Sequence, residues 1–355
     1  MNIKSVLLFE PESAESIYPH SIMHTWWEIR CGYYRLFEKL QLILPEQRII
    51  FQSDELRLRS FLARHGHASQ SIVRENILIL NSAILPTREL FDEMSSRMAQ
   101  EAADGERAVI FSYRSLPFAL FMPASELLNP LDSDRSFLPS LLMAFREHYQ
   151  KIEIESACPI SFLWDAIELC PQGIASDFDL ARGLDDSNAE TFTGAHLINR
   201  SNMIIRKGVE IGPGAVIDAS SGPVIIGENA RIMPNAVLVG PCAIGDKSII
   251  KIGAKIYEGT SIGPVSKVGG EVEGSIIQGF SNKQHDGFLG HSYLGEWVNL
   301  GADTNTSDLK NNYGMVSAKL RGRTIPTGRQ FLGLLAADHT KTGINTMLNT
   351  GTVAG

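Results

Sequence analysis

The sequence has few of the features that mark secreted, membrane-bound or metal-binding proteins. Its four cysteines, Cys31, Cys158, Cys170 and Cys242, show no paired spacing, which argues against a disulfide framework and a zinc site and predicts buried thiols. The only N-terminal apolar run, around Val6–Phe9, is too short for a signal peptide or a membrane span. We therefore expect a cytoplasmic protein without a bound metal and without a membrane partner.

A strong positive charge is also missing. The chain carries a net charge of -8, but residues 195–355 hold 15 Lys and Arg against 12 Asp and Glu. This weakly basic half suits small anionic ligands such as phosphates or coenzyme A. It is too weak for a nucleic-acid footprint, so we expect no nucleic-acid partner.

A six-residue repeat dominates the C-terminal half. Small residues stand two positions before most members of a strictly spaced aliphatic series, which predicts short strands joined by tight corners around an apolar interior. The aliphatic series is Ile226, Ile232, Leu238, Ile244, Ile250, Ile256 and Ile262, and the small series is Ala230, Ala236, Cys242, Ser248, Ala254 and Thr260.

Three repeats make one coil of a left-handed parallel β-helix. Gly227, Gly245 and Gly263 follow aliphatic residues at intervals of eighteen, as one recurring corner requires. The pattern breaks at Pro264–Lys283 and at Asp303–Gln330. Because insertions into a solenoid often carry its binding chemistry, we expect functional residues at these breaks.

The N-terminal half alternates strand-like and helix-like segments and predicts an α/β domain with a largely parallel sheet. We place the boundary between residues 1–184 and residues 185–355, with a helical connector at the end of the first part. The expected strands are Val6–Phe9, Arg48–Phe51, Ile77–Leu80 and Ala108–Phe111; the expected helices are Glu55–His65 and Thr87–Glu101, with Arg135–Lys151 and Leu163–Leu180 in the connector.

A glycine-rich phosphate loop is absent after the first strand. Phe9 is followed by EPESAESIYPHS, with no glycine before Gly32 and with acids that repel a phosphate. This absence counts against nucleotidyl transfer.

The stretch SNKQHDGFLGHSYLGEWVNLGADTNTSDLKNNYG, residues Ser281–Gly314, carries a family resemblance. It resembles the acetyltransferase domain of the bifunctional N-acetylglucosamine-1-phosphate uridylyltransferase/glucosamine-1-phosphate N-acetyltransferases, as a divergent bacterial subgroup. The plan of the whole chain, a nucleotidyltransferase-like domain followed by a β-helix, is similar. The resemblance implies acetyl-CoA as co-substrate, an amino-sugar phosphate as acceptor, a role in sugar-nucleotide synthesis for the cell envelope, and a homotrimer.

The resemblance also implies roles for single residues. His285 matches the catalytic base, and imidazole is suited to take a proton from an attacking amine near neutral pH. Asn299 matches a sugar-binding asparagine, and Lys251 matches an arginine that binds the sugar phosphate. Asn312 and Tyr313 match an asparagine–tyrosine pair at the acetyl-CoA pocket. His291 and His339 lack this placement, and we expect them at the solvent or at the edge of the core.

Some positions depart from the family pattern. Phe288 replaces a tyrosine that contacts the substrate, and Glu273 replaces a phosphate-binding lysine, whose role Lys267 or Lys283 could take over. In the N-terminal domain Asn81 stands where the family has a magnesium-binding aspartate. Because an amide is a poorer ligand for Mg²⁺, we expect this ion only if the N-terminal domain remains active.

Three functions follow from these patterns. The first is an acyl-CoA-dependent N-acyltransferase with His285 as base. The second is a sugar-1-phosphate nucleotidyltransferase whose β-helix only assembles a trimer, and the third is a non-catalytic protein that binds a sugar nucleotide. The sequence also ends on GTVAG without a polar cap, so we expect the natural chain to continue beyond Gly355 or a partner to cover this coil.

Overall fold

The computed structural model describes residues 1–11, 14–67, 73–101, 107–126, 149–184 and 192–355. Contacts group the chain into two compact units, and the predicted division after residue 184 stays a prediction. The N-terminal unit comprises Met1–Ala14, Met23–Glu28 and Leu36–Ile160, and the C-terminal unit comprises Glu15–Ile22, Ile29–Arg35 and Ser161–Gly355. Within the described ranges, no helix combines the length and the apolar composition that a membrane crossing requires.

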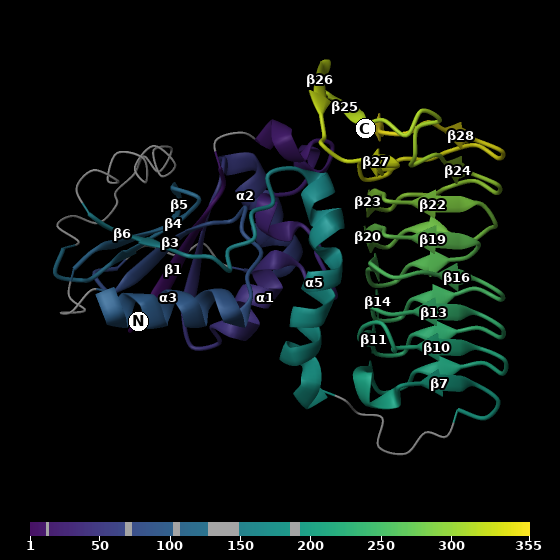
Figure 1. Cartoon of the computed structure of the whole chain (residues 1–355), viewed down its shortest axis with the longest axis horizontal. Helices are drawn as coiled ribbons and strands as arrows, with labels where there is room; N and C mark the ends of the chain where they lie inside the picture. The colour runs from purple at the N-terminus through teal and green to yellow at the C-terminus, as the bar shows by residue number, and fades with distance from the viewer. Residues whose placement is uncertain (12–13, 68–72, 102–106, 127–148, 185–191) are drawn as a thin grey trace. The chain divides into compact units, whose positions relative to one another are not determined.

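A six-stranded sheet forms the centre of the N-terminal unit, in the order β2-β1-β3-β5-β4-β6 (Figure 1). All four predicted strands are confirmed, and buried Val, Ile, Leu and Phe side chains on them supply its core. The strands are β1 (Ser5–Phe9), β2 (Arg48–Gln52), β3 (Ile77–Asn81), β4 (Val109–Tyr113), β5 (Leu116–Met122) and β6 (Gln150–Glu153).

The sheet is largely parallel, as predicted, with one antiparallel strand. β1 pairs in parallel with β2 and β3, but β5 runs antiparallel to both of its neighbours, β3 and β4. The short turn between β4 and β5, with Arg114 and Ser115 at positive φ, makes a hairpin, and a hairpin can join only antiparallel strands. β6 pairs in parallel with β4, so among the described strands only β5 runs against the others, and the prediction of a largely parallel sheet is confirmed.

Three predicted helices, Glu55–His65, Thr87–Glu101 and Leu163–Leu180, are confirmed. Asp54 caps the start of α2, and Gly66 ends it in a left-handed conformation. The first part of the predicted connector, 135–148, lies outside the described residues, and the expected helix is wrong at its end because β6 begins at Gln150. The α-helices are α1 (Leu36–Ile43), α2 (Glu55–His65), α3 (Arg88–Glu101) and α5 (Leu163–Ala181); the short helices are Ala14–Ile17, His20–Ile22, Trp26–Glu28, Arg182–Leu184 and Arg200–Asn202.

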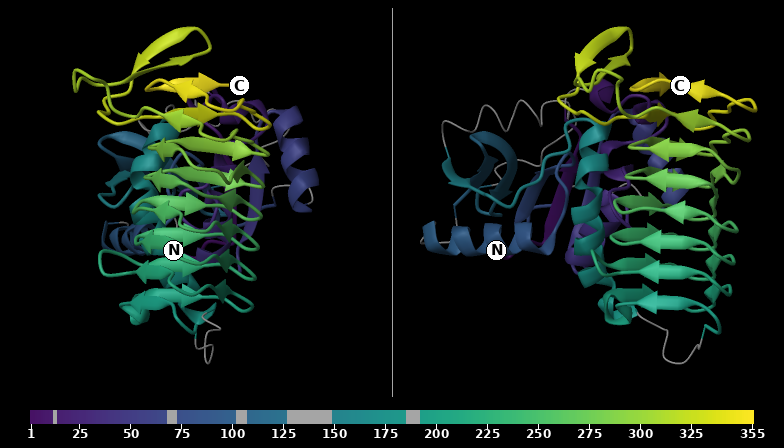
Figure 2. Two further views of the ribbon diagram at one scale, coloured as in Figure 1. Left: turned by 90° about the vertical axis from the view of Figure 1, so that its right-hand side faces the viewer. Right: turned by 45° about the vertical axis from the view of Figure 1, so that its right-hand side comes forward.

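The C-terminal unit is a β-helix of stacked coils, as the six-residue repeat predicts (Figures 1 and 2). Its parallel strands form three faces, which we call A, B and C. Face A contains β7 (His196–Ile198), β10 (Val216–Asp218), β13 (Val237–Val239), β16 (Lys255–Ile256), β19 (Glu271–Glu273) and β22 (Phe288–Gly290). Face B contains β8 (Met203–Ile205), β11 (Val224–Ile226), β14 (Cys242–Ile244), β17 (Thr260–Ile262), β20 (Ile276–Gly279), β23 (Tyr293–Glu296), β27 (Leu334–Ala336) and β29 (Thr352–Ala354). Face C contains β9 (Glu210–Ile211), β12 (Arg231–Ile232), β15 (Ile249–Ile250), β18 (Lys267–Val268) and β21 (Asn282–Lys283).

The aliphatic and small series fill the interior of the coils. Every member of both series is buried, with an exposed fraction of 1% or less. Ile226, Ile244 and Ile262 are direct partners in neighbouring strands, so the interval of eighteen residues is one coil. Three of the four cysteines are buried free thiols as predicted, whereas Cys158 is partly exposed.

The first break in the repeat is not an interruption of the fold. Ile262 pairs with Ile277 and Val268 pairs with Lys283, so the coils continue through Pro264–Lys283 with 15 residues instead of 18. Shorter corners therefore replace the loop that we expected there. The strands β18, β19 and β20 keep their places on the three faces, which is possible because a coil is held only by its two neighbours.

The second break is a true insertion. It leaves the coil after β24 (Asn305–Thr306), forms the antiparallel hairpin of β25 (Ser317–Leu320) and β26 (Arg323–Pro326), and rejoins face B at β27 (Figure 2). The last coil then passes through β28 (Met347–Leu348), which pairs with β24.

Face B is covered on its outer side. Its strands from β8 to β27 have buried residues throughout, as in MII and VII, whereas strands of faces A and C alternate between buried and more exposed positions, as in β9 and β10. Helix α5 contacts this face, and the segment Ile29–Arg35 also joins it: Arg30 N donates to Tyr293 Oη at 3.1 Å and Ser261 Oγ donates to Gly32 O at 2.6 Å. Face B is therefore a buried layer, and faces A and C are open within this chain.

Candidate functional site

His285 stands at the corner that joins face C to face A. This corner, residues 284–287, lies between β21 and β22, and the His285 side chain is exposed. The preceding Lys283 faces the interior of the β-helix, because its strand partner Val268 is an interior residue. Its ammonium donates to the backbone oxygen of His285 at 2.7 Å. This placement favours a structural role for Lys283 over the predicted contact with a phosphate.

Burial changes the acid–base properties of Lys283. Its exposed fraction is 3%, and the loss of hydration lowers the pKa of its ammonium to about 8, although the charge of Asp286 acts in the opposite direction. Loss of the Lys283 proton, about one pH unit above neutrality, therefore weakens the hydrogen bond that its ammonium donates to this corner.

A column of polar side chains runs along the outside of face C next to this corner. Lys267 pairs with Asn282, which is bridged to Asn299, and Asn299 is bridged in turn to Lys341. Asn282 Nδ2 donates to Asn299 Oδ1 at 3.1 Å, while the buried Asn282 Oδ1 has no hydrogen-bond partner among the described residues. The column thus places two cations, Lys267 and Lys341, beside the amide of Asn299, a composition suited to a phosphorylated sugar.

Lys251 lies at the same corner two coils earlier. A side chain added at Gly269 would sit 3.1 Å from Lys251 Cβ and 2.5 Å from Gln284 O, so Lys251, Gly269 and Gln284 are stacked on one another. The fold therefore brings four predicted residues, His285, Lys251, Lys267 and Asn299, to one corner and its adjoining face.

Asn312 and Tyr313 do not join this group within one chain. They lie in the insertion, which leaves from the corner between faces A and B. Both are exposed; Asn312 Oδ1 accepts from Gly314 N at 3.0 Å, and Gln330 Nε2 donates to Tyr313 O at 3.0 Å. Their predicted contribution to the site of His285 would require a second copy of the chain.

Among the described residues, the side chains at the carboxyl ends of the parallel strands β1 and β3 do not fit a magnesium site. Asn81 Oδ1, where the family has an aspartate, accepts from Ala83 N at 2.9 Å. Glu10 Oε1 accepts from Trp26 N at 2.8 Å, and Glu10 Oε2 is 3.2 Å from an Arg57 nitrogen. These side-chain oxygens already serve the protein's own backbone and Arg57, whereas a hard dication needs oxygens that are free to bind it.

The sequence analysis did not predict that His291 pairs with a carboxylate. His291, expected at the solvent or the core edge, is at the corner between faces A and B, and its Nδ1 lies 2.7 Å from Asp308 Oδ2. The two residues are 17 positions apart, which is the length of one coil here because Ile277 pairs with Leu294. The coil is 18 residues long earlier in the β-helix and 17 here, so a search for polar residues 17 positions after His291 would have identified Asp308.

Comparison with known proteins supports this two-part organisation. Residues 6–184 match a family of sugar nucleotidyl transferases, and residues 223–257 match the bacterial transferase hexapeptide of six repeats. One similar protein is the bifunctional protein GlmU of Rippkaea orientalis (strain PCC 8801 / RF-1), which is 33% identical over 113 residues, covering 31% of this chain and 23% of the relative. Another is an uncharacterized acetyltransferase, YaiX, of Escherichia coli O6:K15:H31 (strain 536 / UPEC), which is 30% identical over 149 residues, covering 41% of this chain and 65% of the relative.

A third relative is a bifunctional sugar-1-phosphate nucleotidylyltransferase/acetyltransferase of Sulfurisphaera tokodaii (strain DSM 16993 / JCM 10545 / NBRC 100140 / 7), 31% identical over 159 residues, covering 44% of this chain and 34% of the relative. The chain thus matches between 23% and 65% of the length of these relatives. Because the first family model spans half of the sequence and the second falls on the β-helix, the chain belongs to the sugar nucleotidyl transferase family, as a divergent GlmU-like member with hexapeptide repeats.

Proposed function

We propose that the protein is an acyl-CoA-dependent N-acyltransferase that acetylates an amino-sugar phosphate. The observation that carries this proposal is the grouping at one corner of an exposed imidazole, His285, with the polar column of face C. Acetyl-CoA as donor and sugar-nucleotide synthesis as the setting are proposed from the names of the relatives. A cytoplasmic location is proposed because both substrates are soluble metabolites.

The reaction assigns a role to each residue of this group. The amine of the sugar attacks the thioester carbonyl, and His285 takes the proton that the amine loses as the C–N bond forms. The C–S bond then breaks, and His285 returns the proton to the departing thiolate. Backbone N–H groups of the coil stabilise the intermediate oxyanion, while Lys251 and Lys267 hold the phosphate and Asn299 the sugar.

We further propose a homotrimer in which each site combines residues from two chains. The supporting observation is the separation of Asn312 and Tyr313 from His285 by one face of the β-helix. In this arrangement the exposed insertion of one chain supplies the coenzyme A contacts at the His285 corner of the next. Flat solenoid faces pack readily about a symmetry axis.

The acyltransferase is tested by following thiol release from acetyl-CoA with glucosamine 1-phosphate and other amino-sugar phosphates. Replacing His285 by alanine is expected to lower the rate about 100-fold, because a general base contributes at least that much. His196→Ala, an exposed histidine on β7, is the control and should keep the full rate. Equal rates for wild type and His285→Ala across the panel would reject the assignment.

The family match favours a second function, sugar-nucleotide formation by the N-terminal unit. Since the oxygens of Glu10 and Asn81 are already engaged, we rank it below acyl transfer. With Mg²⁺, a nucleoside triphosphate and a sugar 1-phosphate, the protein is expected to release no pyrophosphate above background. Rapid release that His285→Ala leaves unchanged would reverse this ranking.

A further inference from the structure

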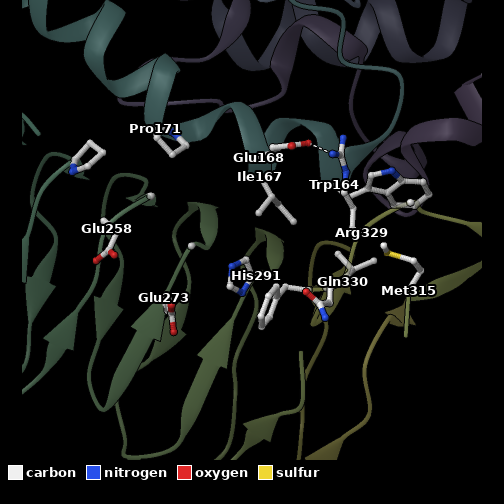
Figure 3. A pocket seen from close by; sticks show the side chains of 16 residues that line it. Trp164, Ile167, Glu168, Pro171, Glu258, Glu273, His291, Met315, Arg329 and Gln330 are labelled. Carbon is white, nitrogen blue, oxygen red and sulfur yellow. Dashed lines mark ion pairs between the residues drawn. The ribbon is translucent and has the colours of Figure 1, made fainter. Parts of the chain in front are cut away.

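A pocket of about 620 Å³ lies between α5 and the corner that joins faces A and B. Figure 3 shows Glu258, Glu273 and His291 in a row along successive coils, on the side of the pocket opposite α5. The insertion closes one end with Arg329 and Gln330, and the neighbouring Phe331 also lines the pocket. Every lining residue belongs to the C-terminal unit, and none of the residues assigned above to acyl transfer is among them.

His291 is held in this pocket by several independent contacts. Its backbone N–H donates to Glu273 O at 3.0 Å, and its backbone carbonyl accepts from Gly333 N at 3.0 Å. Its ring stacks on Phe331 with the two ring centroids 5.1 Å apart. The residue adopts a φ of 42°, a conformation that costs free energy for a side chain of this size. The fold therefore keeps this histidine in place against a conformational cost.

Two glycines make room for the His291–Asp308 pair. A methyl group at Gly290 would lie 2.3 Å from Asp308 Oδ2, and one at Gly274 would lie 3.1 Å from His291 Nε2. The carboxylate of Asp308 faces Nδ1, so in the neutral ring the proton sits on Nδ1 and Nε2 offers a lone pair. His291 is thus oriented to accept a hydrogen bond from a ligand on its Nε2 side.

The charges around the pocket select the ligand. The only cationic lining residue, Arg329, is paired with Asp165 at 2.9 Å and with Glu168. The carboxylates of Glu258 and Glu273 have no basic partner within the pocket lining. Acceptors therefore outnumber free donors, which disfavours a phosphate and favours a ligand rich in hydroxyl groups or bearing an ammonium.

Apolar side chains line the pocket beside these acceptors. Ile167 and Trp164 on α5 are buried, while Met315 and Phe331 on the insertion are exposed by 61% and 43%. A wall of this kind beside hydrogen-bond acceptors matches the two aspects of a pyranose, whose C–H groups pack on apolar surfaces and whose O–H groups point outward.

We propose that this pocket is a second binding site, which takes a neutral or amine-bearing sugar unit. A hydroxyl or ammonium group of the sugar donates to His291 Nε2, further donors bind Glu258 and Glu273, and the ring packs on Ile167, Met315 and Phe331. The site goes beyond the proposed acyl transfer and does not depend on it, because it shares no residue with the His285 corner.

The test is a titration by calorimetry and by saturation-transfer NMR, with glucose, glucosamine and N-acetylglucosamine as probes and glucosamine 6-phosphate as the anionic comparison. At least one uncharged or amine-bearing sugar is expected to bind the wild type through His291, whereas binding of the phosphate, which the His285 corner can also take, should be the same in the wild type and in His291→Ala. Because a hydrogen bond to His291 is lost, His291→Ala should weaken sugar binding about tenfold. His291→Asn, which tolerates the left-handed backbone, guards against misfolding and should have the same effect.

The matched control is His339→Ala. His339 also has a positive φ, 61°, and stacks on an aromatic ring, Trp297, but it does not line the pocket. This variant should bind the sugars as the wild type does. The proposal is overturned if none of the sugars binds, if His291→Ala weakens binding of the phosphate as much as that of the sugars, or if sugar binding survives both changes at His291. Loss of sugar binding in His291→Ala with unchanged acyl transfer separates this site from the proposed reaction.

Discussion

Replacing Glu28 by alanine is expected to lower the free energy of unfolding by about 3–5 kcal/mol, because it leaves several buried donors without their shared acceptor. Glu28 has an exposed fraction of 0%. Its carboxylate lies 3.2 Å from His24 Nδ1, 3.1 Å from His65 Nε2 and 2.8 Å from an Arg64 nitrogen. The N–H and hydroxyl of Thr25 donate to its other oxygen at 2.8 and 2.9 Å.

The same contacts determine how the free energy of unfolding depends on pH. Burial alone would raise the pKa of Glu28, but the hydrogen bonds of His24 and His65 and the charge of Arg64 outweigh it and hold the pKa well below its ordinary value of 4.5. Below about pH 4.5 the unfolded chain therefore binds a proton at this position that the folded chain does not. The stability contributed by Glu28 is present above that pH and is lost as the pH falls.

Urea unfolding followed by tryptophan fluorescence measures both effects, since Trp26 and Trp27 are near neighbours in sequence. The control is Glu55→Ala, which removes an ion pair with Arg59 in which both side chains are 76% exposed. It should cost less than about 1 kcal/mol. Glu28→Gln should flatten the pH dependence below pH 4.5, and equal stabilities of Glu28→Ala and Glu55→Ala would contradict the role given to this carboxylate.

Replacing Lys283 by methionine is expected to stabilise the protein at neutral pH. Burial lowers the pKa of this ammonium from 10.5 to about 8. The unfolded chain thus holds more protons between these two values, and the stability of the wild type rises with pH across this window. Methionine fills similar space without a charge. The free energy of unfolding of the variant should therefore exceed that of the wild type by roughly 3 kcal/mol at pH 7, and the difference should vanish near pH 10.5.

Unfolding curves at several pH values between 7 and 10.5 test this expectation. Lys267→Met is the matched control, because Lys267 is also on face C but exposed on its outer side, and it should show no such trend. Direct titration of the Lys283 Nζ signal by NMR gives an independent reading. An ordinary value near 10.5 would show that the ammonium reaches water and does not stay beside His285 O.

The periodicity of the β-helix made most of its fold predictable. Interior positions of a coil accept only aliphatic or small side chains, so the spacing from Ile226 to Ile262 reports the stacking directly. Coil length is less visible, because a corner can lose residues while the strands remain in register, as between Ile262 and Ile277. That loss produced the false interruption at Pro264–Lys283.

The candidate site was predictable only in part. His285, Lys251, Lys267 and Asn299 lie together because one corner recurs in each coil, but the inward direction of Lys283 depends on its register with Val268. A lysine in an interior position contradicts the expectation that charged residues stay in water. Similarly, the pairing of His291 with Asp308 could not be predicted from an eighteen-residue coil, because the coil at this point has 17 residues.

The way in which the insertion leaves the β-helix has an evolutionary consequence. Leu309 and Phe331 form an antiparallel bridge at its base, so the chain departs and returns at one point while the coils on either side stay paired. Residues 310–330 are thereby released from the six-residue period that constrains the remainder of the unit. Substitutions can accumulate at the exposed positions of this segment without disturbing the stack, whereas Val316, Ala318 and Leu320 stay buried where β25 contacts β29. Related proteins can therefore diverge in what the exposed positions recognise while they inherit the same scaffold.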